Sequence, residues 1–255
     1  MHVKRLLITT ALLCNSTLFL VAQEQTETRT FMNAPSWNYS VGLGADVPMA
    51  DLADRFGTNM AFKAQIERQT SSDWLFSFQF DFMFGNTVKE DIFDYVRLDN
   101  GQILGANNTY AVVLQRMRGA FMGVGVGKVI NLSSKYRSGL KVSLSAGVFG
   151  HHVRLIDDER SFPQLDGDYK KGLDRMTRGI GLKQFVGWQY LSDNNRINLY
   201  AGFEFTQGFT SAVRDFDFDR ALPSDQNARL DGAVGLRVGF IVPFYGGYED
   251  EEVFY

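Results

Sequence analysis

Cysteine is almost absent from this 255-residue chain, in which Cys14 is the single example. A disulfide within the chain is therefore excluded, and so is a centre built from several thiolates. Beyond residue 22, no apolar run approaches the ~20 residues that a membrane-spanning helix needs. Stability must come from packing and hydrogen bonds, and a membrane protein with this sequence would have to be a β-barrel.

An excess of positive charge is also lacking. Residues 1–22 contain two bases and no acids, so the rest of the chain has 24 Lys and Arg against 29 Asp and Glu, a net charge of −5. A protein with a negative net charge does not attract polyanions over its whole surface, so we expect no nucleic acid partner. We also expect no cofactor.

The first 22 residues have the three-part layout of a secretory signal peptide. Lys4 and Arg5 precede an apolar run, and the sequence turns polar at Gln23. We predict a signal peptide at 1–22, a flexible lead-in at 23–36 and export of the mature chain. Cys14 leaves open an acylated lipoprotein, although the apolar run continues past it.

The clearest internal pattern is WLFSFQFDFMFG, residues 74–85. A strand turns successive side chains to opposite faces, so six aromatic residues share one face and a largely polar set shares the other. A soluble sandwich core would also accept one such strand. The pattern recurs, however, in seven further segments. The eight predicted strands are residues 37–48, 60–69, 74–85, 111–130, 140–149, 180–190, 197–206 and 230–242.

The connections between these segments alternate between long and short. Short turns at 70–73, 131–137 and 192–195 alternate with longer connections near 48–59, 86–110, 154–177 and 210–228. Short periplasmic turns and longer outer loops are typical of an up-and-down transmembrane barrel. We therefore predict an all-β, eight-stranded antiparallel barrel over 37–247 with a C-terminal tail at 248–255. A short helical turn is expected within 49–59, and a β-bulge where the alternation slips near 118–120.

The predicted lipid-facing side of the barrel carries aromatic residues near the strand ends and along residues 74–85, as expected for an outer-membrane wall with aromatic girdles. These residues are Trp37, Trp74, Phe76, Phe78, Phe80, Phe82, Phe84 and Trp188.

The predicted inward face collects charges of both signs, which suggests a paired network that plugs a lumen only wide enough for side chains. Its members are Asp46, Lys63, Glu67, Asp81, Lys141, Lys183, Glu204, Asp231 and Arg237. Inward glycines leave room, so a narrow, porin-like solute channel stays open as an alternative.

A lipid-modifying barrel enzyme is a further alternative. His151 and His152 lie at the outer end of the fifth strand, where Ser161 or Ser211 would be a nucleophile and Asp157 or Glu159 would orient the histidine. No spacing rule supports this grouping, and we predict no catalytic residues. Alternating Asp215, Asp217 and Asp219 lack the glycine and distal glutamate of a calcium loop, so we predict no metal site.

The signal peptide, the eight alternating strands and the aromatic terminus at 252–255 together resemble the small eight-stranded outer-membrane barrels of Gram-negative bacteria, the OmpA/OmpX-like and PorT-like superfamily. Two segments, PQLDGDYKKGLDR at 163–175 and RDFDFDR at 214–220, look distinctive for a narrower family within it. The resemblance implies an outer-membrane location, and its PorT-like side implies an accessory role in a secretion or assembly system.

We therefore expect a non-enzymatic structural or interaction protein of the outer membrane. Its partners would be outer-membrane lipid and lipopolysaccharide, together with proteins that contact the connections 86–110, 154–177 and 210–228.

Overall fold

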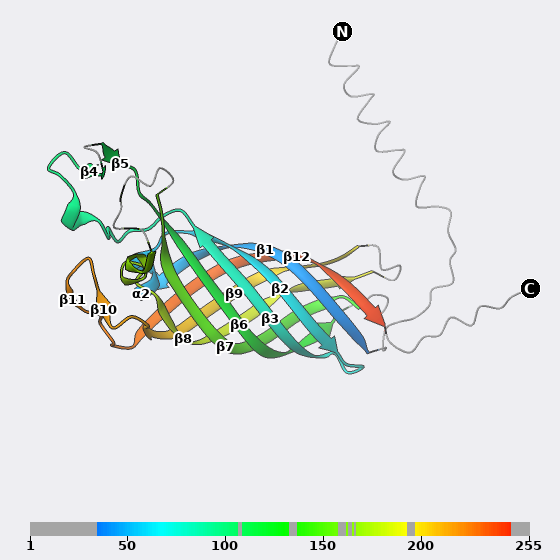
Figure 1. Ribbon diagram of the computed structural model, residues 1–255. Helices are drawn as coiled ribbons and strands as arrows, with labels where there is room; N and C mark the ends of the chain where they lie inside the picture. The colour runs from blue at the N-terminus through cyan, green and yellow to red at the C-terminus, as the bar shows by residue number, and fades with distance from the viewer. Residues whose placement is uncertain are drawn as a thin grey trace, which may run out of the picture. The chain divides into compact units, whose positions relative to one another are not determined.

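The computed structural model describes residues 35–106, 109–132, 137–157, 162, 165, 167–192 and 197–245 (Figure 1). The predicted signal peptide at 1–22, all but the end of the 23–36 lead-in, and the 248–255 tail lie outside the described residues. The strands of the barrel extend from Ser36 to Tyr245, where 37–247 was predicted.

Eight antiparallel strands form one closed barrel, in which each strand pairs with its neighbours in the chain and β1 closes the ring with β12 (Figure 1). The prediction of an eight-stranded antiparallel up-and-down barrel is confirmed. The strands are β1 (Ser36–Ala50), β2 (Asn59–Gln69), β3 (Trp74–Gly85), β6 (Leu114–Asn131), β7 (Gly139–Ile156), β8 (Thr177–Leu191), β9 (Asn198–Ala212) and β12 (Arg229–Tyr245).

Smaller elements lie in the long connections, which gather at one end of the barrel (Figure 1). The predicted helical turn is found as α2. The helices in the described part of the chain are short, and none has the length and hydropathy of a membrane-spanning helix. The smaller elements are α2 (Asp51–Arg55), η2 (Asp94–Val96), β4 (Ile103–Leu104), β5 (Tyr110–Ala111), η5 (Gly167–Gly172), β10 (Phe216–Asp217) and β11 (Leu222–Pro223).

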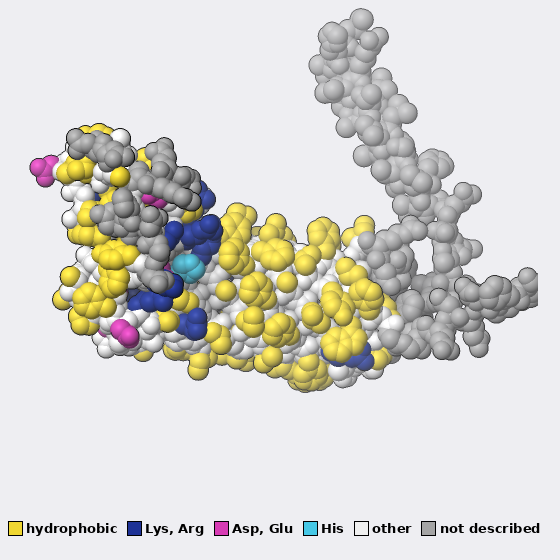
Figure 2. Space-filling model, in the orientation of Figure 1, with side chains coloured by type: hydrophobic (Ala, Val, Ile, Leu, Met, Phe, Trp, Pro, Cys, Tyr) yellow, Lys and Arg dark blue, Asp and Glu magenta, His cyan; other side chains and the backbone are white. Residues whose placement is uncertain are grey.

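The apolar face of each strand points out of the barrel. In β3, Phe76 is 56% exposed whereas the next residue, Ser77, is 9% exposed. All eight predicted wall aromatics point outward, with Phe80 and Phe84 half-buried between neighbours and the other six exposed. Figure 2 shows hydrophobic side chains covering the barrel wall as a broad belt. A soluble sandwich, which would bury this face, is therefore excluded.

The predicted bulge near 118–120 is wrong. Residues of β6 pair one to one with β3 through this region, with Phe82 opposite Ala120 and Phe84 opposite Arg118. The strand pairing continues without interruption, but the polarity of the two faces changes. Arg118 is a polar residue on the outward face of β6, whereas the apolar Met117 and Phe121 point inward and are fully buried. Above the apolar belt, the wall therefore has a polar outside and an apolar inside, as in a soluble protein.

Candidate functional site

A network of ion pairs crosses the lumen around Glu204 of β9. The Glu204 carboxylate accepts from Lys63 Nζ of β2 at 2.7 Å and from Lys183 Nζ of β8 at 3.0 Å. Arg237 Nη2 of β12 lies 3.1 Å from the same carboxylate. One acid thus joins three cations from three strands, and the barrel must be closed for them to meet.

The rest of the network satisfies the remaining charges. Arg237 Nη2 lies 2.7 Å from Asp46 Oδ1 of β1, Lys183 also pairs with Asp81 of β3, and Lys141 of β7 lies 2.9 Å from Glu67 of β2. Among the nine residues predicted for the lumen, none is more than 4% exposed. Eight form these pairs, four acids against four bases, and only Asp231 lies in a different cluster.

Aromatic rings fill the lumen beside the lysines. Lys183 Nζ lies 5.0 Å from the centre of the Phe121 ring, Lys63 Nζ 5.7 Å from that of Phe185, and Lys141 Nζ 5.9 Å from that of Tyr200. Such cation–π contacts strengthen in a desolvated site. The rings occupy the space that inward glycines leave: a Cβ added at Gly42 would collide with the Tyr200 hydroxyl. Glycine therefore admits large side chains here, which does not support an open channel.

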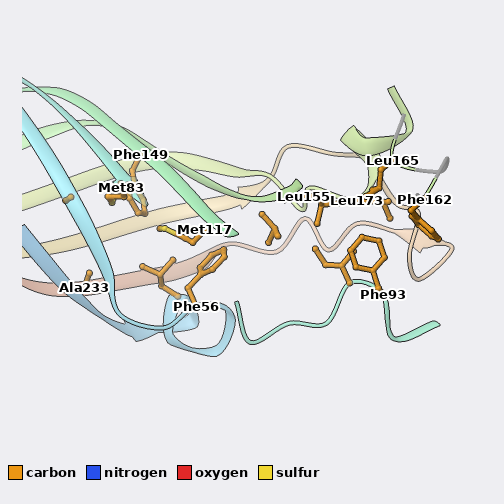
Figure 3. Packing of buried hydrophobic residues seen from close by; sticks show 14 of the residues in the cluster. Phe56, Met83, Phe93, Met117, Phe149, Leu155, Phe162, Leu165, Leu173 and Ala233 are labelled. Atoms are coloured by element: carbon orange, nitrogen blue, oxygen red, sulfur yellow. The ribbon is translucent and has the colours of Figure 1, made fainter. Parts of the chain in front are cut away.

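An apolar core closes the barrel towards the long connections (Figure 3). Phe56, which follows α2, packs in the mouth with inward residues of the strands, and Leu155 continues the core among the connections. The labelled members are Phe56, Met83, Phe93, Met117, Phe149, Leu155, Phe162, Leu165, Leu173 and Ala233. A layer of this kind excludes water from the ion pairs below it.

His151 lies inside the wall at the boundary between these two layers. It is 1% exposed, its Nε2 lies 2.8 Å from Asp231 Oδ2, and the Thr177 hydroxyl lies 3.0 Å from the same nitrogen. Thr210 donates to Asp231 at 2.5 Å. This arrangement has the residue types of a catalytic triad, but it is sealed from solvent and positions an internal histidine.

The residues considered for an enzyme are not brought together. His152 points outward, away from His151, and Ser211 pairs across strands with Arg178 on the outer wall. Asp157 accepts a hydrogen bond from the backbone of Phe162. Ser161 and Glu159 lie outside the described residues. Within the described part of the chain, no cluster of three or more His, Cys, Asp or Glu side chains is arranged to hold a metal.

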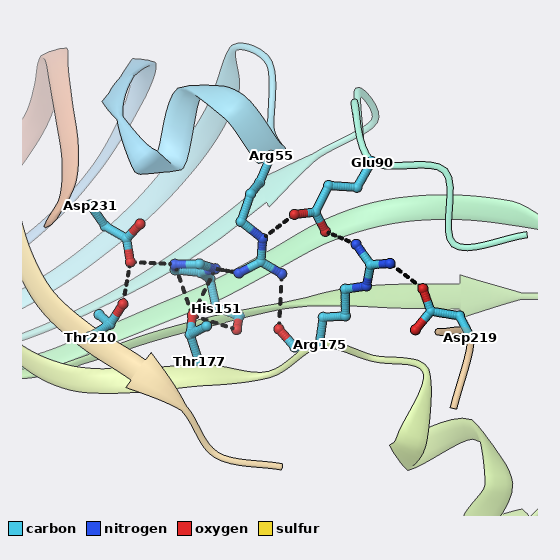
Figure 4. Close-up of polar contacts among 8 residues, drawn as sticks. All are labelled: Arg55, Glu90, His151, Arg175, Thr177, Thr210, Asp219 and Asp231. Carbon is cyan, nitrogen blue, oxygen red and sulfur yellow. Dashed lines mark hydrogen bonds and ion pairs between the residues drawn. The ribbon is translucent and has the colours of Figure 1, made fainter. Parts of the chain in front are cut away.

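A chain of polar contacts joins the long connections to one another and to His151 (Figure 4). Arg55 of α2 lies 3.4 Å from His151 Nδ1 and donates to Glu90 at 3.0 Å. Arg175 donates to the other Glu90 oxygen at 2.9 Å and also pairs with Asp219. These four charged residues come from all four long connections, so the chain holds the connections together as one cap.

Sequence reasoning missed this chain because the residues whose side chains contact each other in it lie 35 to 96 positions apart in the sequence. Nor did it identify the pairing in the RDFDFDR segment. Arg214 donates to Asp174 at 3.1 and 2.6 Å, and Asp217 accepts from Ser224 at 2.5 Å. The one available signal was that Arg175 and Asp219 fall in the two segments that look distinctive.

Acidification is expected to loosen the cap. Burial disfavours the charged form of Glu90, but Arg55 and Arg175 outweigh burial and hold the pKa of Glu90 below its ordinary value. Ionised Glu90 therefore stabilises the cap above the ordinary Glu pKa of about 4.3, and this contribution is lost as the pH falls through the lower folded-state pKa. Hydrogen exchange of the four connections, measured from pH 7 to pH 3 and expressed as protection relative to the intrinsic exchange rate at each pH, should show lower protection at the acid end.

Glu90→Gln is the matched variant for this test. It keeps the shape of the side chain and removes its charge, so we expect faster exchange of the connections already at pH 7 and a smaller response to acid. An unchanged acid response in Glu90→Gln would show that other carboxylates hold the cap.

No protein-family model and no curated protein matches the chain. Among solved structures, the chain is similar to Neisserial surface protein A at 12% identity, covering 82% of this chain and 97% of that chain with a TM-score of 0.44. It is similar to Ail, the attachment invasion locus protein of Yersinia pestis, at 13% identity, covering 82% of this chain and 99% of that chain with a TM-score of 0.41. It is also similar to the outer membrane protein OprG from Pseudomonas aeruginosa at 10% identity, covering 84% of this chain and 98% of that chain with a TM-score of 0.36.

Proposed function

We propose that this protein is an integral outer-membrane barrel with a sealed lumen, which acts without enzymatic activity as a structural and interaction protein through its outer connections. The observation that carries the proposal is the reversal of ordinary protein chemistry along the wall. Apolar side chains cover the outside of the barrel, and four acids and four bases are paired inside it.

Membrane insertion is supported by the dimensions of the belt. About 11 residues at a rise of about 3.3 Å, tilted by about 40 to 45°, span about 25 Å, the height of an outer-membrane apolar band. At the end with the short turns, Arg68 and Lys128 each lie 5.3 Å from the centre of a tryptophan ring, Trp37 and Trp74 respectively. Tryptophan and cations together favour the boundary between lipid and water.

The sealed lumen predicts that the refolded protein does not conduct ions in a planar bilayer. The ion-pair layer, the aromatic rings and the apolar core all obstruct the same path, and eight strands leave a lumen that side chains can fill. Electrical recording checks the prediction, with folding confirmed by gel migration and insertion confirmed by co-flotation of the protein with lipid vesicles. Steady stepwise conductance would contradict the seal and favour the channel alternative.

An interaction role is supported by the surface of connection 86–113. Tyr95, Leu98, Leu104, Tyr110 and Val112 are each at least 42% exposed there, although the cap below them is held by partly buried ion pairs. Exposed apolar side chains on a firmly held support are typical of a protein contact. We infer that a protein partner contacts this connection, and an accessory role in secretion or assembly fits such a contact.

Site-specific photo-cross-linking in native membranes tests the interaction. A photoreactive residue in place of Tyr110 should give a discrete protein adduct, whereas one in place of Phe78, on the belt, should give lipid adducts only. Absence of a protein adduct at Tyr110, Leu104 and Tyr95 would remove the support for a partner at this connection.

A further inference from the structure

Four arginines lie close together on the outer wall, directly above the apolar belt. Arg116 of β6 pairs across strands with Arg154 of β7, and Arg118 pairs with the adjacent outward residue, His152. Arg178 of β8 pairs with Gly150 of β7, two residues before His152. Figure 2 shows Lys and Arg side chains gathered beside a histidine at the edge of the hydrophobic surface nearest the cap.

These arginines make no ion pair with any described residue. Arg118 Nη1 donates to the neighbouring carbonyl of Met117 at 2.7 Å, which leaves its charge uncompensated. The nearby carboxylate of Asp174 is already held by Arg214 at 2.6 Å. Like charges directly opposite on neighbouring strands destabilise a sheet. A surface that keeps four of them together is suited to an anion from outside the chain.

A groove in the wall lies immediately below the arginines. Its floor is formed by the small residues Ala120 and Gly150, which face each other on β6 and β7. Phe82, Met122 and Val148 form its apolar sides, and Arg118, Arg178 and His152 complete the lining. The site therefore has a cationic upper part and an apolar lower part, arranged along the direction in which the wall passes from water into lipid.

We propose that this surface binds a phosphorylated glycolipid of the outer leaflet, of the lipid A type, with its phosphate on the arginines and one acyl chain in the groove. Guanidinium groups pair with phosphate through two parallel hydrogen bonds and keep their charge at a lipid boundary. The inference rests on the proposed function, since it requires that the cap face outward and the belt lie in the membrane.

Binding of purified, folded protein in detergent micelles to bisphosphorylated lipid A tests the site. The double variant Arg118→Ala/Arg178→Ala is expected to weaken lipid A binding about tenfold or more, because each substitution removes charge-assisted hydrogen bonds from an arginine to the phosphate. Arg68→Ala/Lys128→Ala, at the opposite edge of the belt, removes the same charge and should leave binding unchanged. Equal losses in the two variants would overturn the site, because they would show attraction by net charge alone.

Two further measurements separate the parts of the ligand. Ala120→Leu fills the groove from the outer face, so it should weaken lipid A binding while leaving the arginines in place. Dephosphorylated lipid A should bind about tenfold more weakly than the phosphorylated form. Equal binding of the dephosphorylated lipid, or displacement of lipid A by inorganic phosphate at equal concentration, would overturn the proposal.

The failure of this inference can be told apart from failure of the proposed function. Folded protein that does not insert into lipid vesicles would contradict the outer-membrane proposal, and with it the orientation that the glycolipid requires. Protein that inserts, but binds lipid A no better in the wild type than in Arg118→Ala/Arg178→Ala, would contradict the glycolipid site alone. Folding of each variant is verified by its thermal midpoint before binding is compared.

Discussion

Replacement of Glu204 by Gln is expected to lower the free energy of unfolding by about 3 to 5 kcal/mol, the range found when one partner of a buried ion pair is removed. Glu204 is 1% exposed and contacts Lys63, Lys183 and Arg237. Without its charge, Lys63 loses its only ion-pair partner among the described residues, and the other two cations keep one acid each. Urea unfolding in lipid vesicles, followed by tryptophan fluorescence, measures the change.

Glu67→Gln is the matched control, because it makes the same chemical change in the same lumen. Glu67 has a single cationic partner, Lys141 at 2.9 Å, and it also accepts from Gln65 at 3.2 Å. A smaller loss of stability is therefore expected than for Glu204→Gln. A loss in Glu204→Gln equal to or below that in Glu67→Gln would show that Glu204 is not the centre of the network.

Replacement of Phe80 by Arg is expected to destabilise the barrel by about 2 to 4 kcal/mol, the cost of an arginine on a lipid-facing wall near the bilayer midplane. Phe80 lies in the middle of β3, between Ala64 of β2 and Met122 of β6, on the outer face. The same vesicle unfolding measurement applies.

Two controls isolate the effect of lipid. Phe80→Leu keeps the position apolar and should cost less than Phe80→Arg, and Leu98→Arg adds the same charge at an exposed position of the cap and should be near neutral. Equal stability of Phe80→Arg and the wild type in vesicles would contradict a lipid-facing β3, and with it the assignment of the whole wall.

The strands could be predicted because their information is local. A residue such as Phe78 differs from its neighbours Ser77 and Gln79 in polarity. Alternation of polarity at every second residue predicts both that the segment is a strand and which face each side chain occupies. Once eight such segments were found, the lengths of the connections determined the topology. The lumen residues follow from the same parity, which places Asp81 and Lys183 on the inward face, where the two side chains form an ion pair.

The cap and the outer-wall arginines could not be predicted in this way. Arg55 and Glu90 meet only because two connections fold over the same barrel mouth, and no period links them. The bulge was predicted wrongly for a related reason. Alternation predicts one chemistry on each face throughout the strand. Met117 is an inward residue of the apolar core above the belt, so the outward Arg118 beside it resembles a change of phase.

Along β6 and β7, the polar side of the wall changes from the inside of the barrel to the outside. The position of this change determines how deeply the barrel lies in the membrane. Below this level, the outside of the wall is suited to hydrocarbon, and above it, the outside carries Arg118 and Arg154 while the inside holds Val153 and Leu155. Sliding the barrel in either direction would expose apolar residues to water or bring arginines into hydrocarbon. The position of this change along the wall therefore fixes the depth at which the barrel lies in the membrane, and a bilayer of different thickness has to deform to match it.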